Sequence, residues 1–140
     1  MSDLNGHAKL PTSMRWDQLM ETEFPPVRWS VEGLFPEGLA YLVAKPKLGK
    51  SWFALSLALD VARGLPVLDK YTADSGYVLY LALEDSLKRI KERGGKLRAT
   101  QTKQLLIRTQ YKPQGSGGLE QLDQELKTAE GKIKLVIIDT

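Results

Sequence analysis

The chain has 140 residues, of which 42% are hydrophobic and 26% are charged, and these values fit a single soluble globular domain. The formal net charge of +3 permits contact with nucleic acid without arguing for it, and the absence of cysteine excludes disulfides and thiolate metal sites. No apolar run approaches the ~18 residues of a membrane span, so we expect a soluble, cytoplasmic protein.

The N-terminal region is predicted to be a tail followed by a short helix. Residues 1–13 are polar and show no periodicity, which is typical of a disordered tail. Residues 14–20 have the pattern of a helix that Thr12 or Ser13 would cap and that ends before the Pro25-Pro26 pair. Its apolar residues lie on one side, so we expect an arm that packs on the body of the protein or on a neighbouring subunit.

Apolar and polar residues alternate over the next segment, residues 27–34, which indicates an extended conformation. Trp29 has two interpretations here: a wall of a base pocket or, with greater weight, an aromatic anchor at the edge of a sheet. Pro36-Glu37-Gly38 is a turn signal. The apolar residues 39–43 that follow it predict a strand.

The eight residues after this strand, AKPKLGKS, match the phosphate-binding loop that joins a strand to a helix. Gly49 has no Cβ, so the backbone N–H groups can approach a phosphate at the N-terminus of the helix. Lys50 would reach the β- and γ-phosphates of a nucleotide, and Ser51 would offer its hydroxyl to Mg²⁺. The candidate nucleotide-binding residues are Ala44, Lys45, Pro46, Lys47, Leu48, Gly49, Lys50, Ser51 and Trp52.

This motif has one variant position and one alternative interpretation. Ala44 stands where the strict motif has glycine, and alanine is the smallest possible substitute. The alternative is an ordinary turn and helix cap, because serine is a good N-cap residue. The apolar segments on both sides of the motif favour the phosphate-binding loop.

A buried helix and a buried strand are predicted next. Residues 52–62 are apolar nearly all round, and Gly64 ends the helix. The continuous apolar run 77–83 indicates a strand covered on both faces of a parallel sheet. Glu84 follows at the strand end, where such sheets bind ligands, so it is a candidate catalytic residue that faces a phosphate. A plain helix cap is the simpler role for residues 85–86.

Residues 87–98 are rich in Lys and Arg, which indicates either a nucleic-acid surface or, more commonly, a solvated basic face. The Gly94-Gly95 pair is expected to break or kink this helix. Further on, residues 104–109 predict a third strand, residues 112–118 a flexible loop and residues 119–129 an amphipathic helix.

The last segment is a β-branched apolar run, residues 134–138, followed by Asp139. A buried strand of this kind places its carboxylate at the carboxyl edge of the sheet, opposite Ser51. The pair would hold Mg²⁺ directly or through water. Many buried strands end in aspartate, so Asp139 alone is weak evidence for a metal site. The evidence becomes strong because the phosphate-binding loop motif precedes it in the sequence.

Three stretches together carry a resemblance to a known family: AKPKLGKS, YLALEDS and LVIIDT. They resemble the RecA-like P-loop ATPases. More narrowly, they are similar to the AAA-family ATPases of phages, plasmids and bacterial mobile elements, close to the hexameric plasmid replicative helicases. The similarity covers residues 14–140 and implies the N-terminal part of a three-layer α/β domain with a mostly parallel sheet.

The resemblance also implies an activity and its residues. The family forms hexameric rings with ATP at the subunit interfaces and couples hydrolysis to movement on single-stranded DNA. If the family's residue roles are carried over to the matching positions, Lys50 binds phosphate and Glu84 polarises the attacking water. Ser51 and Asp139 then hold Mg²⁺. The implied partners are therefore ATP and ADP, single-stranded DNA and further copies of the chain.

The family continues well beyond the strand that ends at Asp139, so the sequence is interpreted as an N-terminal fragment or a truncated gene with an incomplete sheet. Such a chain is expected to be a weak or inactive ATPase alone and to expose a sheet edge that invites dimerisation or strand exchange. A non-hydrolysing nucleotide-binding or interaction remnant is the alternative. A small-molecule kinase is less favoured, because the sequence offers no arginine-rich lid.

Overall fold

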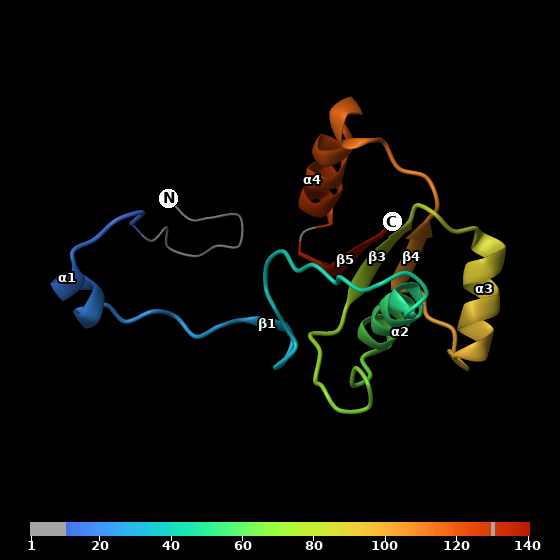
Figure 1. Ribbon diagram of the computed structural model, residues 1–140, viewed down its shortest axis with the longest axis horizontal. Helices are drawn as coiled ribbons and strands as arrows, with labels where there is room; N and C mark the ends of the chain where they lie inside the picture. Colours follow the sequence, from blue (N-terminus) through green and yellow to red (C-terminus); the bar gives the residue numbers. More distant parts are fainter. Residues whose placement is uncertain (1–10, 130) are drawn as a thin grey trace.

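The structure is a computed structural model of residues 1–140, and it describes residues 11–129 and 131–140. It has mixed α/β architecture, with a parallel sheet that lies between helices and an N-terminal segment that extends away from it (Figure 1). The predicted disordered tail lies mostly outside the described residues. Residues 11–13 of that tail have no helix or strand.

The sheet has three strands: β3 (Tyr77–Ala82), β4 (Leu105–Arg108) and β5 (Ile133–Asp139). Their order is β4-β3-β5, and both pairings are parallel. β3 is the central strand and is buried from Val78 to Ala82, as expected for a strand covered on both faces. The three strands predicted around these positions are confirmed.

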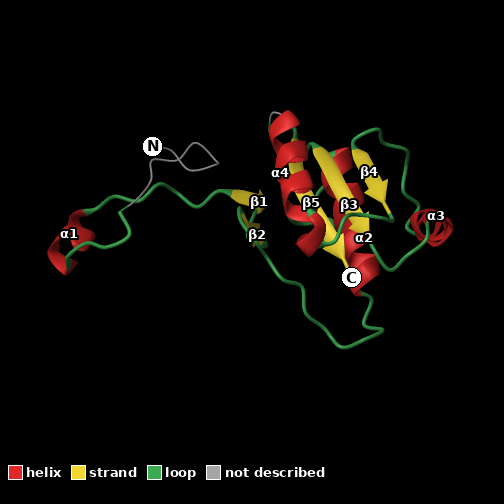
Figure 2. Ribbon diagram, turned by 90° about the horizontal axis from the view of Figure 1, so that it is seen from above, coloured by secondary structure: helices red, strands yellow, loops and turns green. Residues whose placement is uncertain are grey.

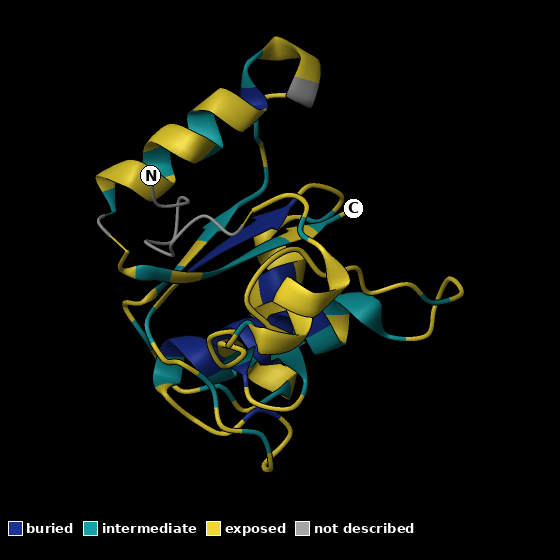
Figure 3. Ribbon diagram, turned by 90° about the vertical axis from the view of Figure 1, so that its left-hand side faces the viewer, coloured by how far each residue is buried: buried dark blue, intermediate teal, exposed yellow. Residues whose placement is uncertain are grey.

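Helices lie on both sides of this sheet (Figure 2). The long helix α2 (Lys50–Arg63) packs on one face and supplies most of the buried core, seen as dark blue in Figure 3. The helix α4 (Gly118–Thr128) lies over the other face and is largely exposed. The third helix, α3 (Leu87–Lys96), lies beside α2 and buries Ile90.

Alternation along the strands decides which side chains face α2, since successive residues of a strand point to opposite faces. The core under α2 contains Val78, Tyr80 and Ala82 of β3. Leu135 and Ile137 of β5 pack against the same core. Asp139 is the next residue in the β5 series and therefore lies on the α2 face, at the carboxyl end of the sheet.

The N-terminal segment contains the helix α1 (Trp16–Glu21) and a small antiparallel pair, β1 (Trp29–Val31) and β2 (Phe35–Pro36). The predicted helix and the extended segment are therefore present. The cap differs, because Arg15 is the N-cap residue and its N–H donates to the side chain of Gln18. None of the α1 residues is buried, and the helix lies away from the body. Of the two predicted arrangements, packing on its own body is not observed, and packing on a neighbouring subunit stays a prediction.

Residues 39–43, predicted as a strand, form none. The segment is a loop, and its apolar side chains are exposed: 82% for Leu39 and Tyr41, and 87% for Val43. A strand forms only where a neighbouring edge pairs with its backbone N–H and C=O groups. No described strand runs beside this segment, so its β-prone composition finds no partner.

Two smaller predictions also differ from the structure. α3 continues through Gly94 and Gly95 to Lys96, because an interior glycine costs a helix only about 1 kcal/mol relative to alanine and buried Ile90 anchors the helix. The expected loop over residues 112–118 contains a 3₁₀ turn, η1 (Gln114–Ser116), before α4 begins at Gly118.

Candidate functional site

The loop before α2 curls because two of its residues adopt left-handed backbone conformations. Lys47 has φ 66° and Gly49 has φ 85°. Glycine adopts positive φ without steric cost, whereas lysine at such a φ is uncommon. Turns of this kind direct successive backbone N–H groups into one concavity that suits an anion.

The ends of this loop are held together by Lys50. Its Nζ donates a hydrogen bond to the backbone carbonyl oxygen of Ala44 at 2.9 Å. Helix α2 begins at Lys50, and its N-cap residue, Gly49, has no side chain to cap the free N–H groups of the first turn. The uncapped amides therefore lie at the positive end of the helix dipole, and the lysine that begins the helix reaches back to the start of the loop.

The first turn of α2 also meets the end of β5. The Ser51 hydroxyl donates a hydrogen bond to Asp139 Oδ1 at 3.1 Å. These residues are 88 positions apart in sequence, and the structure brings them together at the edge of the sheet where the phosphate-loop interpretation requires them. Ser51 and Asp139 thus meet beside the first turn of α2, the helix that begins at Lys50.

A fourth residue, which sequence reasoning missed, joins this cluster. Tyr80 lies in the middle of β3, and its hydroxyl donates a hydrogen bond to Asp139 Oδ2 at 2.7 Å. The strand register pairs Tyr80 with Ile137, so Asp139 is its diagonal neighbour two residues further along β5. The sequence signal was weak, because Tyr80 is one of two tyrosines in an otherwise apolar strand.

Alkaline pH should destabilise the protein through Tyr80. Burial and the hydrogen bond to Asp139 raise the pKa of Tyr80 above its ordinary value of 10.0. The folded state therefore holds this proton more tightly than the unfolded state, whose tyrosine ionises near ~10. As pH rises above that value, the free energy of unfolding should fall by up to about 1.4 kcal/mol per pH unit from this group. Urea unfolding at several alkaline pH values should give a shallower slope for Tyr80→Phe, and equal slopes would contradict the assignment.

The candidate catalytic residue Glu84 lies in the turn between β3 and α3. Its side chain is exposed and has no hydrogen bond or ion pair with any other described residue. Its neighbour Asp85 is firmly held, because its carboxylate forms ion pairs with Arg89 and Arg93 of α3. Ser86 caps α3 by accepting a hydrogen bond from the Arg89 N–H, as predicted for this pair of residues. The two residues that follow Glu84 in the turn are therefore held to α3, whereas Glu84 itself is not.

Comparison with known families assigns the chain to a protein family. A family model described as AAA domain (AAA_25) matches residues 7–140. The chain belongs to this AAA domain family. The family indicates a nucleotide-binding ATPase domain. No curated protein and no solved structure matches the chain significantly.

The oxygen atoms of this AAA domain site suit a small hard cation. Ser51 supplies a hydroxyl and Asp139 a carboxylate, and Mg²⁺ typically binds through one or two carboxylates together with substrate phosphates. No cluster of three His, Cys, Asp or Glu residues that could hold a metal occurs in the described part of the chain. A hydroxyl and a carboxylate are donors of the kind that bind such a cation together with a nucleotide.

Trp52 connects the AAA domain loop to α3. Its ring lies under two cations, with the Arg93 guanidinium 5.7 Å and the Lys96 ammonium 5.9 Å from the ring centroid. Cation–π contacts of this kind are worth about 0.5–1 kcal/mol at exposed sites. Because Arg93 also pairs with Asp85, this side chain connects the start of α2 to the turn that carries Glu84.

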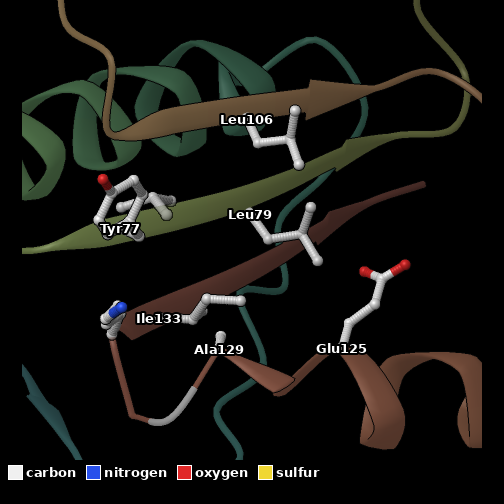
Figure 4. Close-up of a pocket in the computed structure, with 8 residues that line it drawn as sticks. Tyr77, Leu79, Leu106, Glu125, Ala129 and Ile133 are labelled. Carbon is white, nitrogen blue, oxygen red and sulfur yellow. The ribbon is translucent and has the colours of Figure 1, made fainter. Parts of the chain in front are cut away.

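The described part of the AAA domain also contains a cavity of about 250 Å³, which lies away from this cluster. It lies between the α4 region and the face of the sheet that points away from α2. Leu79, Leu106 and Ile133 point into it (Figure 4). The wall is mainly apolar, and its carboxylate, Glu125, is already paired with Arg108. The one cation in its lining, Lys132, comes from the turn before β5, and the cavity shares no residue with the loop of residues 44–51. In the described residues, no helix is long and apolar enough to cross a membrane.

Proposed function

We propose that this AAA domain binds ATP with Mg²⁺ through residues 44–51 and forms the N-terminal part, residues 14–140, of a RecA-like ATPase of the helicase or translocase type found in mobile elements. The observation that carries the proposal is the cluster of Lys50, Ser51 and Asp139. At the uncapped N-terminus of α2, the Lys50 ammonium bonds the start of the loop, and the Ser51 hydroxyl bonds the Asp139 carboxylate.

Each residue has a defined part in hydrolysis. Lys50 and the loop amides neutralise charge on the β- and γ-phosphates. Ser51 and Asp139 hold Mg²⁺, which when bound supplies further neutralisation of the phosphate oxygens. Glu84 orients a water molecule and accepts its proton as the water oxygen attacks Pγ. The bond from Pγ to the bridging oxygen breaks, and ADP and inorganic phosphate result.

A second candidate is a domain that binds nucleotide without hydrolysing it. The exposure of Glu84, with no partner among the described residues to direct its carboxylate, favours this candidate. In that case the residues that hold phosphate are assembled and the residue that activates water is not.

Two measurements on the full chain test the proposal and separate the candidates. Calorimetric titration with ATP·Mg²⁺ should show saturable binding of one nucleotide per chain, and no heat of binding would refute both candidates. A phosphate-release assay then distinguishes hydrolysis from binding alone. Running it with and without single-stranded DNA, and measuring mass by light scattering, tests the proposed DNA partner and the proposed homo-oligomer.

A further inference from the structure

Both carboxylate oxygens of Asp139 are engaged, and by different kinds of donor. Oδ1 accepts from Ser51 at 3.1 Å, and Oδ2 accepts from Tyr80 at 2.7 Å. Ser51 lies in the first turn of a helix at the surface of the site, and its hydroxyl hydrogen can rotate toward or away from Asp139. The two oxygens therefore differ in how easily they can accept a new partner.

The Tyr80 hydroxyl has no such freedom, because its ring is fixed. Tyr80 is 1% exposed and belongs to the core cluster beneath α2. It lies within the central strand, which pairs with a neighbour on each side. Turning the hydroxyl away from Oδ2 would leave both a buried phenol and a carboxylate oxygen without a partner, which is unfavourable for both groups.

We propose that Tyr80 is a positioning residue that makes Asp139 a one-oxygen donor and thereby favours Mg²⁺ over Ca²⁺ at the site. Oδ2 stays with Tyr80, and only Oδ1, next to Ser51, is free to face a cation. Ca²⁺ takes six to eight oxygens and often binds a carboxylate through both, whereas Mg²⁺ takes six and keeps several waters. This inference rests on the proposed nucleotide site.

The test replaces Tyr80 by phenylalanine, which removes the hydroxyl and keeps the ring. A fluorescent, non-hydrolysable ATP analogue is titrated with Mg²⁺ and, separately, with Ca²⁺, and the metal concentration at half-maximal binding is measured. Removal of such an outer partner typically weakens metal binding about 10–100-fold, so the Mg²⁺ midpoint should rise by that factor. The Ca²⁺ midpoint should change less, because Oδ2 becomes available to it.

In Tyr80→Phe, the affinity for the analogue without metal should stay unchanged, because Lys50 and the loop are untouched. A general loss of structure would lower that affinity as well, so this measurement distinguishes the two causes. Tyr77→Phe is the matched control, because Tyr77 lies on the same strand with its side chain at the apolar cavity. An unchanged Mg²⁺ midpoint in folded Tyr80→Phe would overturn the role of Tyr80. Failure of the wild-type chain to bind the analogue would instead overturn the nucleotide site.

If Tyr80→Phe does not fold, the wild-type chain still decides the question. Its Mg²⁺ midpoint should lie below its Ca²⁺ midpoint, because Asp139 offers the cation one oxygen where Ca²⁺ often takes both oxygens of a carboxylate. Equal midpoints would overturn the proposal.

Discussion

Replacing Lys50 by alanine should weaken binding of ATP·Mg²⁺ by roughly 10–100-fold. The Lys50 Nζ lies 2.9 Å from the Ala44 carbonyl oxygen at the start of the loop. A hydrogen bond to a charged group contributes about 1.5–3 kcal/mol, and each 1.4 kcal/mol is about tenfold in affinity. Isothermal titration calorimetry of the variant and the wild type measures the difference directly.

Lys103→Ala is the matched control for this experiment. It removes the same charge from an exposed residue outside the loop, just before β4. Its affinity should equal that of the wild type. If Lys50→Ala binds as tightly as Lys103→Ala, the loop is not the phosphate site, and the alternative of a plain turn and helix cap is correct.

Replacing Glu84 by glutamine should leave nucleotide affinity near the wild-type value and lower the rate of phosphate release by about 10²–10⁴-fold, the usual contribution of a general base. Glutamine keeps the size and polarity of the side chain but cannot accept the proton of the attacking water. Because Glu84 is exposed and lies outside the strands, the substitution should not affect folding.

Glu92→Gln provides the control for Glu84, since Glu92 is an exposed carboxylate on α3. Calorimetry and phosphate release are measured on all three proteins. A variant Glu84→Gln that hydrolyses ATP as fast as Glu92→Gln would show that another group activates the water. Absence of release from the wild type itself would favour the non-hydrolysing candidate.

Local sequence patterns correctly predicted the helices and strands whose own residue composition is enough to specify them. The apolar runs around β3 and β5 became strands, and the helix after the loop ends at Gly64, whose φ of 70° is the left-handed conformation that favours glycine at a helix end. The meeting of Ser51 and Asp139 was also predictable, because the carboxyl ends of parallel strands share one edge of the sheet.

The errors concern features that depend on partners distant in sequence. Residues 39–43 have strand composition, but no described strand pairs with them, and composition cannot reveal a missing neighbour. Tyr80 appeared as one more apolar strand residue, because its diagonal contact with Asp139 depends on the β3–β5 register. A strand register is a property of the sheet, and one strand's sequence does not contain it.

The central claim is that the loop around Gly49 surrounds a polyphosphate while Ser51 and Asp139 converge on one cation. A crystal structure of the chain with a non-hydrolysable ATP analogue and Mn²⁺ tests it most directly, because the anomalous signal locates the metal. The account predicts a single Mn²⁺ peak beside Ser51 Oγ and Asp139 Oδ1, with the phosphates against the Lys50 ammonium. A nucleotide bound elsewhere, or a metal peak away from both oxygens, would contradict it.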